Sequence, residues 1–243
     1  MPTIAENFEL VKAHIAQAAA KSKRSADEIE LVAVTKTHPA ETVREAIDAG
    51  HVLFGESKVQ EARAKIPLLP SNLHWHFIGH LQRNKVRHTL PLFELIHSVD
   101  SLELAQAMDR IAHEDGLHPR VLLEVNVAGE ASKFGFQPEK LRREMESLLG
   151  LPRLSIEGVM CIPPLGEDAE ASRKYFAILR ELRNDFQNEF DLKLPHLSMG
   201  MTNDYAVAVE EGATLVRVGT AIFGERRKQA RQGGSADPPG DAG

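Results

Sequence analysis

A lysine that directly follows an apolar segment has the clearest potential for chemistry in this sequence. Residues 31–35 read Leu-Val-Ala-Val-Thr, and Lys36 comes next. An ammonium group at the end of a buried strand loses hydration, which lowers its pKa and leaves an uncharged amine that can attack an aldehyde. A lysine that ends its strand at the surface is the alternative. The position of Lys36 alone does not decide between the two.

Glycines and hydroxyl side chains follow two later apolar segments, in a pattern typical of phosphate sites. Ser198, Gly200 and Thr202 belong to the first of these segments, and Gly219 and Thr220 end the second. Glycine lets backbone N–H groups approach an anion closely, so we expect the two segments to bind one phosphate group. Two ordinary glycine turns are the alternative. Neither segment carries the Gly-Lys-Ser/Thr of a nucleotide-binding loop.

Several histidines and a basic stretch have less specific interpretations. His74 and His76 alternate along a predicted strand and share one face, with His80 nearby. Apart from His196, no carboxylate–histidine set follows on later strands, so we expect packed or surface histidines rather than a metal site. Residues 82–88 are basic and are expected to form a solvated helix face, with an anion or partner patch as the alternative.

Composition narrows the class of protein. The 243 residues carry 29 Lys and Arg against 35 Asp and Glu, a net charge of −6, which argues against nucleic acid as the main partner. The single Cys161 rules out an internal disulfide framework and fits a reducing compartment. The sequence has no run of about 18 apolar residues and no signal-peptide pattern at Met1. We therefore expect a cytoplasmic protein that does not bind membranes.

Eight short apolar segments alternate with amphipathic stretches along the chain. This alternation predicts an α/β fold with a parallel sheet, and eight units in this length favour closure into a (β/α)8 TIM-type barrel. In such barrels the functional groups lie at the carboxyl ends of the strands, where Lys36 and both phosphate segments are expected. The predicted strands are residues 30–35, 52–55, 74–78, 95–98, 120–127, 155–162, 196–199 and 215–218.

The amphipathic stretches predict helices and a single domain. An extra helix precedes the first strand and is expected to pack outside the barrel or across one end. We expect the barrel domain to cover residues 1–231 and the polar, Gly- and Pro-rich residues 232–243 to be disordered. The helices that we predict in most detail are residues 4–20, 101–112 with Ser101 as the N-cap, 136–149, and 168–190 with an apolar stripe from Tyr175 to Phe190.

Seven short segments, taken together, resemble the pyridoxal phosphate homeostasis proteins of the YggS/PROSC family. The resemblance covers about residues 31–226 and implies a fold-type III barrel, similar to the N-terminal domain of alanine racemase, that binds pyridoxal 5′-phosphate (PLP). Each segment is short, and the specificity comes from their combination and order. The segments are residues 33–37, 54–56, 76–82, 97–100, 125–127, 197–201 and 217–224.

The resemblance also implies roles for individual residues. Lys36 matches the lysine that forms the internal aldimine with PLP, and Arg217 matches the arginine that faces the pyridine nitrogen. The remaining cofactor-binding residues that we predict form the phosphate site and the pocket wall, and they are Ser198, Thr202, Gly219, Thr220, Asn126 and His80.

Several positions depart from the family pattern. Ser57 and Lys58 stand where the family usually has asparagine followed by an aromatic residue or arginine, and the shorter serine cannot reproduce every asparagine hydrogen bond. Thr202 stands where serine is frequent and keeps the hydroxyl. Lys133 lies in a segment similar to a family loop. We expect a solvated lysine there, with a second PLP-reactive amine as the alternative.

The chemistry of PLP separates a carrier from an enzyme such as an amino-acid racemase. A charged arginine beside the pyridine nitrogen disfavours its protonation and weakens the electron sink, although alanine racemase also has an arginine there. Racemisation needs a second acid–base group, which alanine racemase takes from a tyrosine of another domain. Tyr175 and Tyr205 lie in helical patterns and occupy no evident second-base position.

We therefore expect a non-enzymatic protein that holds PLP as an internal aldimine and serves intracellular PLP homeostasis. A PLP-dependent racemase-like enzyme is the alternative, and a sugar-phosphate barrel enzyme with Lys36 as its Schiff-base lysine is a third interpretation. The expected partners are PLP and the PLP-dependent apo-enzymes that accept it, and we expect a monomer.

Overall fold

The chain folds into a closed barrel of eight parallel strands. The computed structural model describes residues 2–130, 133–164 and 166–224. Each strand pairs with the next, and β8 pairs with β1, which confirms the predicted (β/α)8 barrel. The predicted domain boundary at residue 231 and the tail after it lie outside the described residues. The strands are β1 (Glu30–Val34), β2 (Leu53–Glu56), β3 (His74–Phe77), β4 (Leu95–Val99), β5 (Arg120–Glu124), β6 (Ser155–Met160), β7 (His196–Met201) and β8 (Leu215–Val218).

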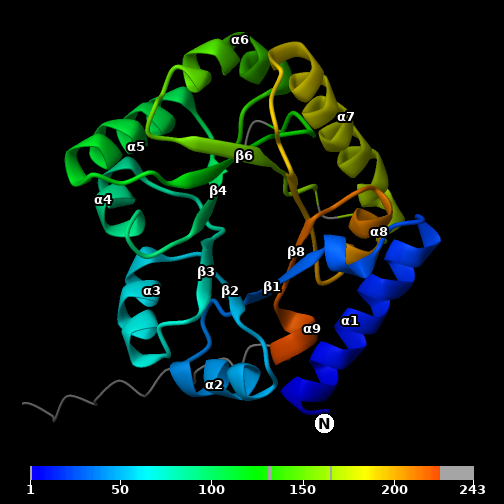
Figure 1. The fold of residues 1–243 in the computed structure, drawn as a ribbon. Helices are drawn as coiled ribbons and strands as arrows, with labels where there is room; N and C mark the ends of the chain where they lie inside the picture. Colours follow the sequence, from blue (N-terminus) through cyan, green and yellow to red (C-terminus); the bar gives the residue numbers. More distant parts are fainter. Residues whose placement is uncertain (1, 131–132, 165, 225–243) are drawn as a thin grey trace, which may run out of the picture.

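Helices surround the ring of strands (Figure 1). Short 3-10 turns accompany them at residues 26–28, 66–68, 83–85 and 170–172. Within the described residues, no helix has the length and apolar composition needed to cross a bilayer. The α-helices are α1 (Ile4–Lys21), α2 (Ala40–Asp48), α3 (Val59–Lys65), α4 (Val86–Thr89), α5 (Leu102–Asp115), α6 (Pro138–Leu149), α7 (Arg173–Phe190), α8 (Tyr205–Glu210) and α9 (Thr220–Phe223).

Helix ends follow the capping pattern of the sequence. The Ser101 hydroxyl accepts from the Leu104 N–H at 3.4 Å, which confirms Ser101 as the N-cap of α5. The helix predicted from residue 168 begins later, as α7 at Arg173, because residues 170–172 form a 3-10 turn. At the first position of the apolar stripe, Phe176 is buried three residues before the buried Leu179, whereas Tyr175, which we predicted there, is only half-buried.

The extra helix α1 lies outside the barrel, beside α8 and α9 (Figure 1). The Asn7 side chain donates to the carbonyl of Ile222 at 2.8 Å, and Phe8 contacts Phe223 edge to face. His14 Nδ1 lies 3.0 Å from the Tyr205 hydroxyl. Helix α1 therefore supports α9, the short helix that follows the last strand and begins at a predicted site residue.

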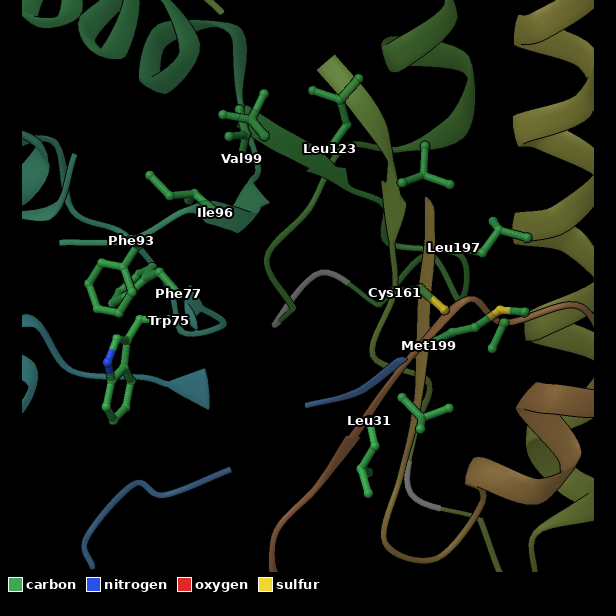
Figure 2. Close-up of a cluster of buried hydrophobic side chains, with 14 of the residues drawn as sticks. Leu31, Trp75, Phe77, Phe93, Ile96, Val99, Leu123, Cys161, Leu197 and Met199 are labelled. Carbon is green, nitrogen blue, oxygen red and sulfur yellow. The ribbon is translucent and has the colours of Figure 1, made fainter. Parts of the chain in front are cut away.

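Strand alternation divides the apolar core into two layers. The larger layer lies between the strands and the helices, and Figure 2 shows part of it, including Trp75 and Phe77. A smaller layer fills the barrel interior. Because successive strand residues point to opposite sides, both layers come from the same strands. The interior residues are Val32, Leu95, Leu122, Met160 and Leu215.

A candidate cofactor site at the carboxyl ends of the strands

A cleft of about 1050 Å³ is lined by residues that follow the carboxyl ends of several strands. Residues from the segments after β1, β6, β7 and β8 form most of its wall. The amine, the guanidinium and part of the phosphate site that we predicted therefore lie around one space. The predicted site residues that line it are Lys36, Thr202, Arg217, Gly219 and Thr220.

Buried hydrogen bonds anchor the residue before Lys36. The Thr35 hydroxyl donates to Glu56 Oε1 at 2.6 Å, and the Thr35 carbonyl accepts from Lys65 Nζ at 2.8 Å. Glu56 and Lys65 form an ion pair, and both are buried. Burial raises the pKa of the Glu56 carboxyl, and Lys65 opposes this. The end of β1 is thus held to β2 and α3 immediately before the half-buried Lys36.

The residue after Lys36 has an unusual backbone conformation. Thr37 has φ 69°, in the left-handed region that β-branched residues rarely adopt. Its N–H donates to Glu61 Oε1 at 3.0 Å, which stabilises this conformation. Strained backbone of this kind is concentrated at functional sites, where the surrounding structure holds it. Lys36 therefore lies between two fixed neighbours.

Close packing of β8 on β1 brings Gly219 and Thr220, which we predicted to bind phosphate, next to the end of β1. Val218 pairs with Ala33, so Gly219 comes to lie against Val34. A Cβ atom at Gly219 would lie 3.2 Å from the Val34 carbonyl oxygen, closer than most such contacts, so any residue other than glycine requires a small local shift. Glycine at this position places Thr220 and Lys36 in the wall of the same cleft.

A buried carboxylate shapes the segment after β7. The Asp204 carboxylate accepts from the Met201 N–H at 2.7 Å and from the Ser172 hydroxyl at 2.9 Å. Gly200 has φ 90°, a conformation open to glycine without strain. The turn holds Thr202 in the cleft wall. We had not predicted a role for Asp204, although an acidic residue shortly after a strand end is a frequent turn-forming signal.

Arg217 is buried at the base of the cleft and is 4% exposed. One of its Nη atoms donates to the Ser198 hydroxyl oxygen, and the other donates to the Cys161 carbonyl at 3.0 Å. Burial lowers the pKa of the guanidinium, and the carboxylates of Glu124 and Asp204 oppose this. Because both hydrogen-bond acceptors are neutral, Arg217 brings a positive charge to the cleft wall.

Three predicted site residues do not line this cleft. Ser198 is fully buried, and its hydroxyl contacts Arg217 and His97 inside the barrel. The Asn126 side chain donates to the backbone carbonyls of Glu130, at 2.8 Å, and Lys133, at 3.4 Å. The Asn126 amide thus holds the loop that carries Lys133.

His80 is the third of these residues. Its ring stacks on Phe134 with the centroids 3.6 Å apart, and its Nδ1 lies 3.0 Å from Asp100 Oδ2. His80 lines a separate hollow of about 450 Å³ together with Asp100 and Ser101. The structure thus places Ser198, Asn126 and His80 around the cleft residues rather than in the cleft wall, and their predicted contacts with PLP stay predictions.

The positions that depart from the family pattern have distinct environments. Ser57 lines the cleft and lies against Gly79, where a Cβ atom would be 2.2 Å from the Ser57 carbonyl oxygen. Lys58 is exposed at the N-cap of α3. Lys133 is exposed as we expected, yet it also lines the cleft. Among the residues that the structure describes, the cleft wall therefore contains two primary amines, of which Lys36 is the more buried.

The histidines that we considered as metal ligands have other partners. His74 Nδ1 lies 2.6 Å from Glu94 Oε2 near the amino ends of the strands. His76 Nδ1 lies 3.0 Å from His97 Nε2 in the barrel interior. The basic stretch 82–88 is helical, and Arg87 forms ion pairs with Glu114 and Asp115 of α5.

Two buried polar residues near Arg217 were not predicted as parts of the site. His97 joins Ser198 to His76, and the alternation of Leu95 and His97 could have indicated that His97 faces inward. Glu124 ends β5, and burial raises the pKa of its carboxyl to about 7, helped by Asp100 and opposed by Arg217. Local polarity alone did not distinguish these two residues from surface positions.

Comparison with known proteins confirms the family that the sequence resembles. The model of the alanine racemase N-terminal domain family matches residues 4–227. The pyridoxal phosphate homeostasis protein of Aquifex aeolicus is 44% identical over 223 residues, which are 91% of this chain and 98% of that protein.

Solved structures agree with the sequence comparison. PipY of Synechococcus elongatus PCC7942 is similar both without PLP (41% identity, TM-score 0.83, 91% of this chain) and with PLP bound (43%, 0.77, 86%). Both comparisons cover 100% of the PipY chain. The alanine racemase of Clostridium difficile shares the fold, with 17% identity, a TM-score of 0.69, and 92% of this chain matched to 58% of that one. The chain therefore belongs to the pyridoxal phosphate homeostasis proteins, within the alanine racemase N-terminal domain family.

Proposed function

We propose that this protein binds PLP in the cleft, with the Lys36 amine bonded to the aldehyde carbon of the cofactor, and that it serves PLP homeostasis without turning over a substrate. One observation carries the proposal: Lys36, Arg217 and the Gly219–Thr220 pair line a single cleft. PLP supplies an aldehyde that condenses with amines, a pyridine nitrogen and a phosphate dianion. Each of these groups has a chemically matched partner in the cleft wall.

The phosphate partners that we propose differ by one residue, Ser198, from those that we predicted from the sequence. The hydroxyls of Thr202 and Thr220 belong to residues of the cleft wall, whereas the Ser198 hydroxyl is engaged below it by Arg217 and His97. Glycine at 219 keeps the backbone close to β1. We therefore assign the phosphate to Gly219, Thr220 and Thr202, and we assign Ser198 to the support of Arg217.

Arg217 suits the pyridine nitrogen for an electrostatic reason. A guanidinium only donates hydrogen bonds, so it pairs with an unprotonated nitrogen and disfavours the pyridinium. A ring whose pyridine nitrogen is unprotonated has a lower capacity to stabilise a carbanion. Arg217 therefore supports storage of the cofactor more than it supports reaction at the α-carbon of an amino acid.

The positions of the tyrosines also favour a carrier over a racemase. Tyr205 is buried in α8 with its hydroxyl 3.0 Å from His14, and Tyr175 lies in α7. Neither belongs to the cleft wall. The runner-up function, racemase-like chemistry, is supported by the family model and the shared fold.

Reductive trapping tests the proposal directly. The protein with PLP should show a visible absorption band, and borohydride followed by peptide mapping should place the adduct on Lys36. Lys36→Ala should abolish the band, and Lys133→Ala is the matched control that should retain it. An adduct found only on Lys133 would show that Lys36 is not the amine that bonds to the cofactor, and would contradict the proposal. Turnover of any proteinogenic amino acid that disappears in Lys36→Ala would favour the enzyme.

The cellular setting belongs to the same proposal. We propose that the protein acts in the cytoplasm, which the single Cys161 supports. Apo-enzymes that require PLP are the proposed acceptors, and a monomer is the proposed state. Light scattering of the purified protein tests the last point, and transfer of PLP to an apo-enzyme, followed by the recovery of its activity, tests the acceptor.

A further inference from the structure

A chain of hydrogen bonds crosses the barrel interior and ends at Arg217. Arg217 on β8 donates to the Ser198 hydroxyl on β7. That hydroxyl lies 2.8 Å from His97 Nδ1 on β4, and His97 Nε2 lies 3.0 Å from His76 Nδ1 on β3. We call these four residues the interior relay. The contact between Ser198 and His97 joins the neighbouring strands β7 and β8 to the neighbouring strands β3 and β4 across the barrel.

The chemistry of the donors determines which group donates the hydrogen in each bond of the relay. Because a guanidinium only donates, the Ser198 oxygen accepts from Arg217 and its own hydrogen is left for His97 Nδ1. His97 then carries its hydrogen on Nε2 and donates it to His76 Nδ1. The opposite direction would leave the fully buried Ser198 hydroxyl hydrogen with no acceptor among the described residues, which is unfavourable.

The burial of the two imidazoles agrees with this neutral arrangement. His97 is completely buried and His76 is nearly so. Burial lowers the pKa of His76 to about 4 and places the pKa of His97 well below its ordinary value, with Arg217 opposing a second charge beside it. The other charged or titratable groups that act on these two rings are Glu94, Arg120, His196 and His74.

We propose that Ser198 and His97 are positioning residues, which fix the plane of the Arg217 guanidinium at the cleft wall and thereby set the affinity for PLP without touching it. The guanidinium is rigid and planar, so the bonds to Ser198 and to the Cys161 carbonyl determine its orientation. Supporting residues of this kind commonly hold a binding group in its productive geometry. This inference rests on the proposed PLP function.

The tautomers can be measured in the protein without PLP. With ¹⁵N-labelled histidine, NMR should show His97 and His76 both neutral at pH 7, with hydrogen on Nε2 and none on Nδ1. Assignment comes from loss of each signal in His97→Asn and His76→Gln. A hydrogen on His97 Nδ1 would overturn the inference, whatever the result with the cofactor.

Variants test the effect on the cofactor. Ser198→Ala and His97→Leu should each weaken PLP binding about tenfold, mainly through faster release, while the adduct still maps to Lys36. His97→Asn places a carbonyl oxygen near the Nδ1 position and should restore most of the affinity. His113→Asn, which changes an exposed histidine of α5 outside the relay, is the control and should bind as the unchanged protein does.

The outcomes separate this inference from the proposed function. Unchanged affinity in both Ser198→Ala and His97→Leu, or an equal loss in His97→Asn and His97→Leu, would refute the positioning role and leave PLP binding intact. If the unchanged protein forms no adduct at Lys36, the proposed function fails instead, and the tautomer of His97 still decides the direction of the relay. Should His97→Leu not fold, the tautomer and Ser198→Ala decide.

Discussion

The Thr35 hydroxyl donates to the buried carboxylate of Glu56 at 2.6 Å, one residue before the lysine that we assign to PLP. The same carboxylate pairs with Lys65, whose amine also binds the Thr35 carbonyl. A fully buried carboxylate therefore orders the end of β1 and the ammonium of α3 together. The position of Lys36 depends on this group, even though Glu56 does not line the cleft.

Removal of Glu56 should consequently destabilise the protein and disturb Lys36. Glu56→Ala leaves the Lys65 ammonium buried without its carboxylate, which costs about 3–5 kcal/mol of unfolding free energy. Denaturant unfolding measures this loss, and PLP trapping should slow in parallel. Glu9→Ala removes the exposed pair with Lys12 and should change stability by less than about 1 kcal/mol. Equal effects of the two substitutions would contradict the anchoring role of Glu56.

Gly219→Ala should weaken cofactor binding more than it weakens the fold. The added Cβ would lie 3.2 Å from the Val34 carbonyl oxygen, so β1 or β8 must shift by a few tenths of an ångström at this point, and we expect Thr220 to move with Gly219. Overpacking of this kind costs about 1–3 kcal/mol. Gly150→Ala is the matched control, since its φ is −72° and a Cβ there meets nothing closer than 3.4 Å. Titration with PLP should show an effect for Gly219→Ala alone.

Asp204→Ala should loosen the turn that holds Thr202. The variant leaves the Met201 N–H and the Ser172 hydroxyl without their acceptor, and we expect PLP affinity to fall about tenfold through the phosphate contact. Asp204→Asn keeps one acceptor oxygen and should lose less. Competition by inorganic phosphate reports the same site without the aldehyde. If phosphate competes equally well in Asp204→Ala, the turn does not shape the phosphate site.

The sequence predicted the barrel because eight apolar segments alternate with amphipathic ones, and that periodicity is local. Strand ends were harder to predict. We extended the fifth strand to residue 127, yet β5 ends at Glu124, since the Asn126 N–H donates to the Phe136 carbonyl of a segment that folds back. A hydrogen-bond partner ten residues later in the sequence cannot be inferred from the local pattern of apolar residues.

Lys36 and Gly219 directly follow strand ends, and both line the cleft as we expected from that position; their contacts with PLP stay predictions. The position of a side chain was harder to predict where strand register determines it. Ser198 and Thr202 both carry hydroxyls close to the end of β7, and the pairing of β7 with β8 shifts register between Ser198 and Met201. That irregularity changes which side chain faces the cleft, because a bulge re-aims the residues after it. His97 was missed because its partners lie on other strands.

His76 gives the protein a pH-dependent term in its stability. The ring has a pKa of about 4 when folded, below its ordinary value of 6.5, so the unfolded chain takes up the proton first as the pH falls. The stabilising contribution of the neutral ring is therefore complete above pH 6.5 and is lost between pH 6.5 and 4, by on the order of 3 kcal/mol.

His76→Gln isolates this term. Other groups titrate in the same range, among them Glu124 with a pKa of about 7, but they do so in both proteins and cancel in the difference. Unfolding by denaturant from pH 7 to pH 4 should show the unchanged protein losing stability faster than His76→Gln, so that the gap between them narrows or reverses. A gap that stays constant with pH would mean that folding leaves the pKa of His76 at its ordinary value. A gap that widens toward pH 4 would mean that the folded ring is protonated, which is incompatible with its hydrogen bond from His97.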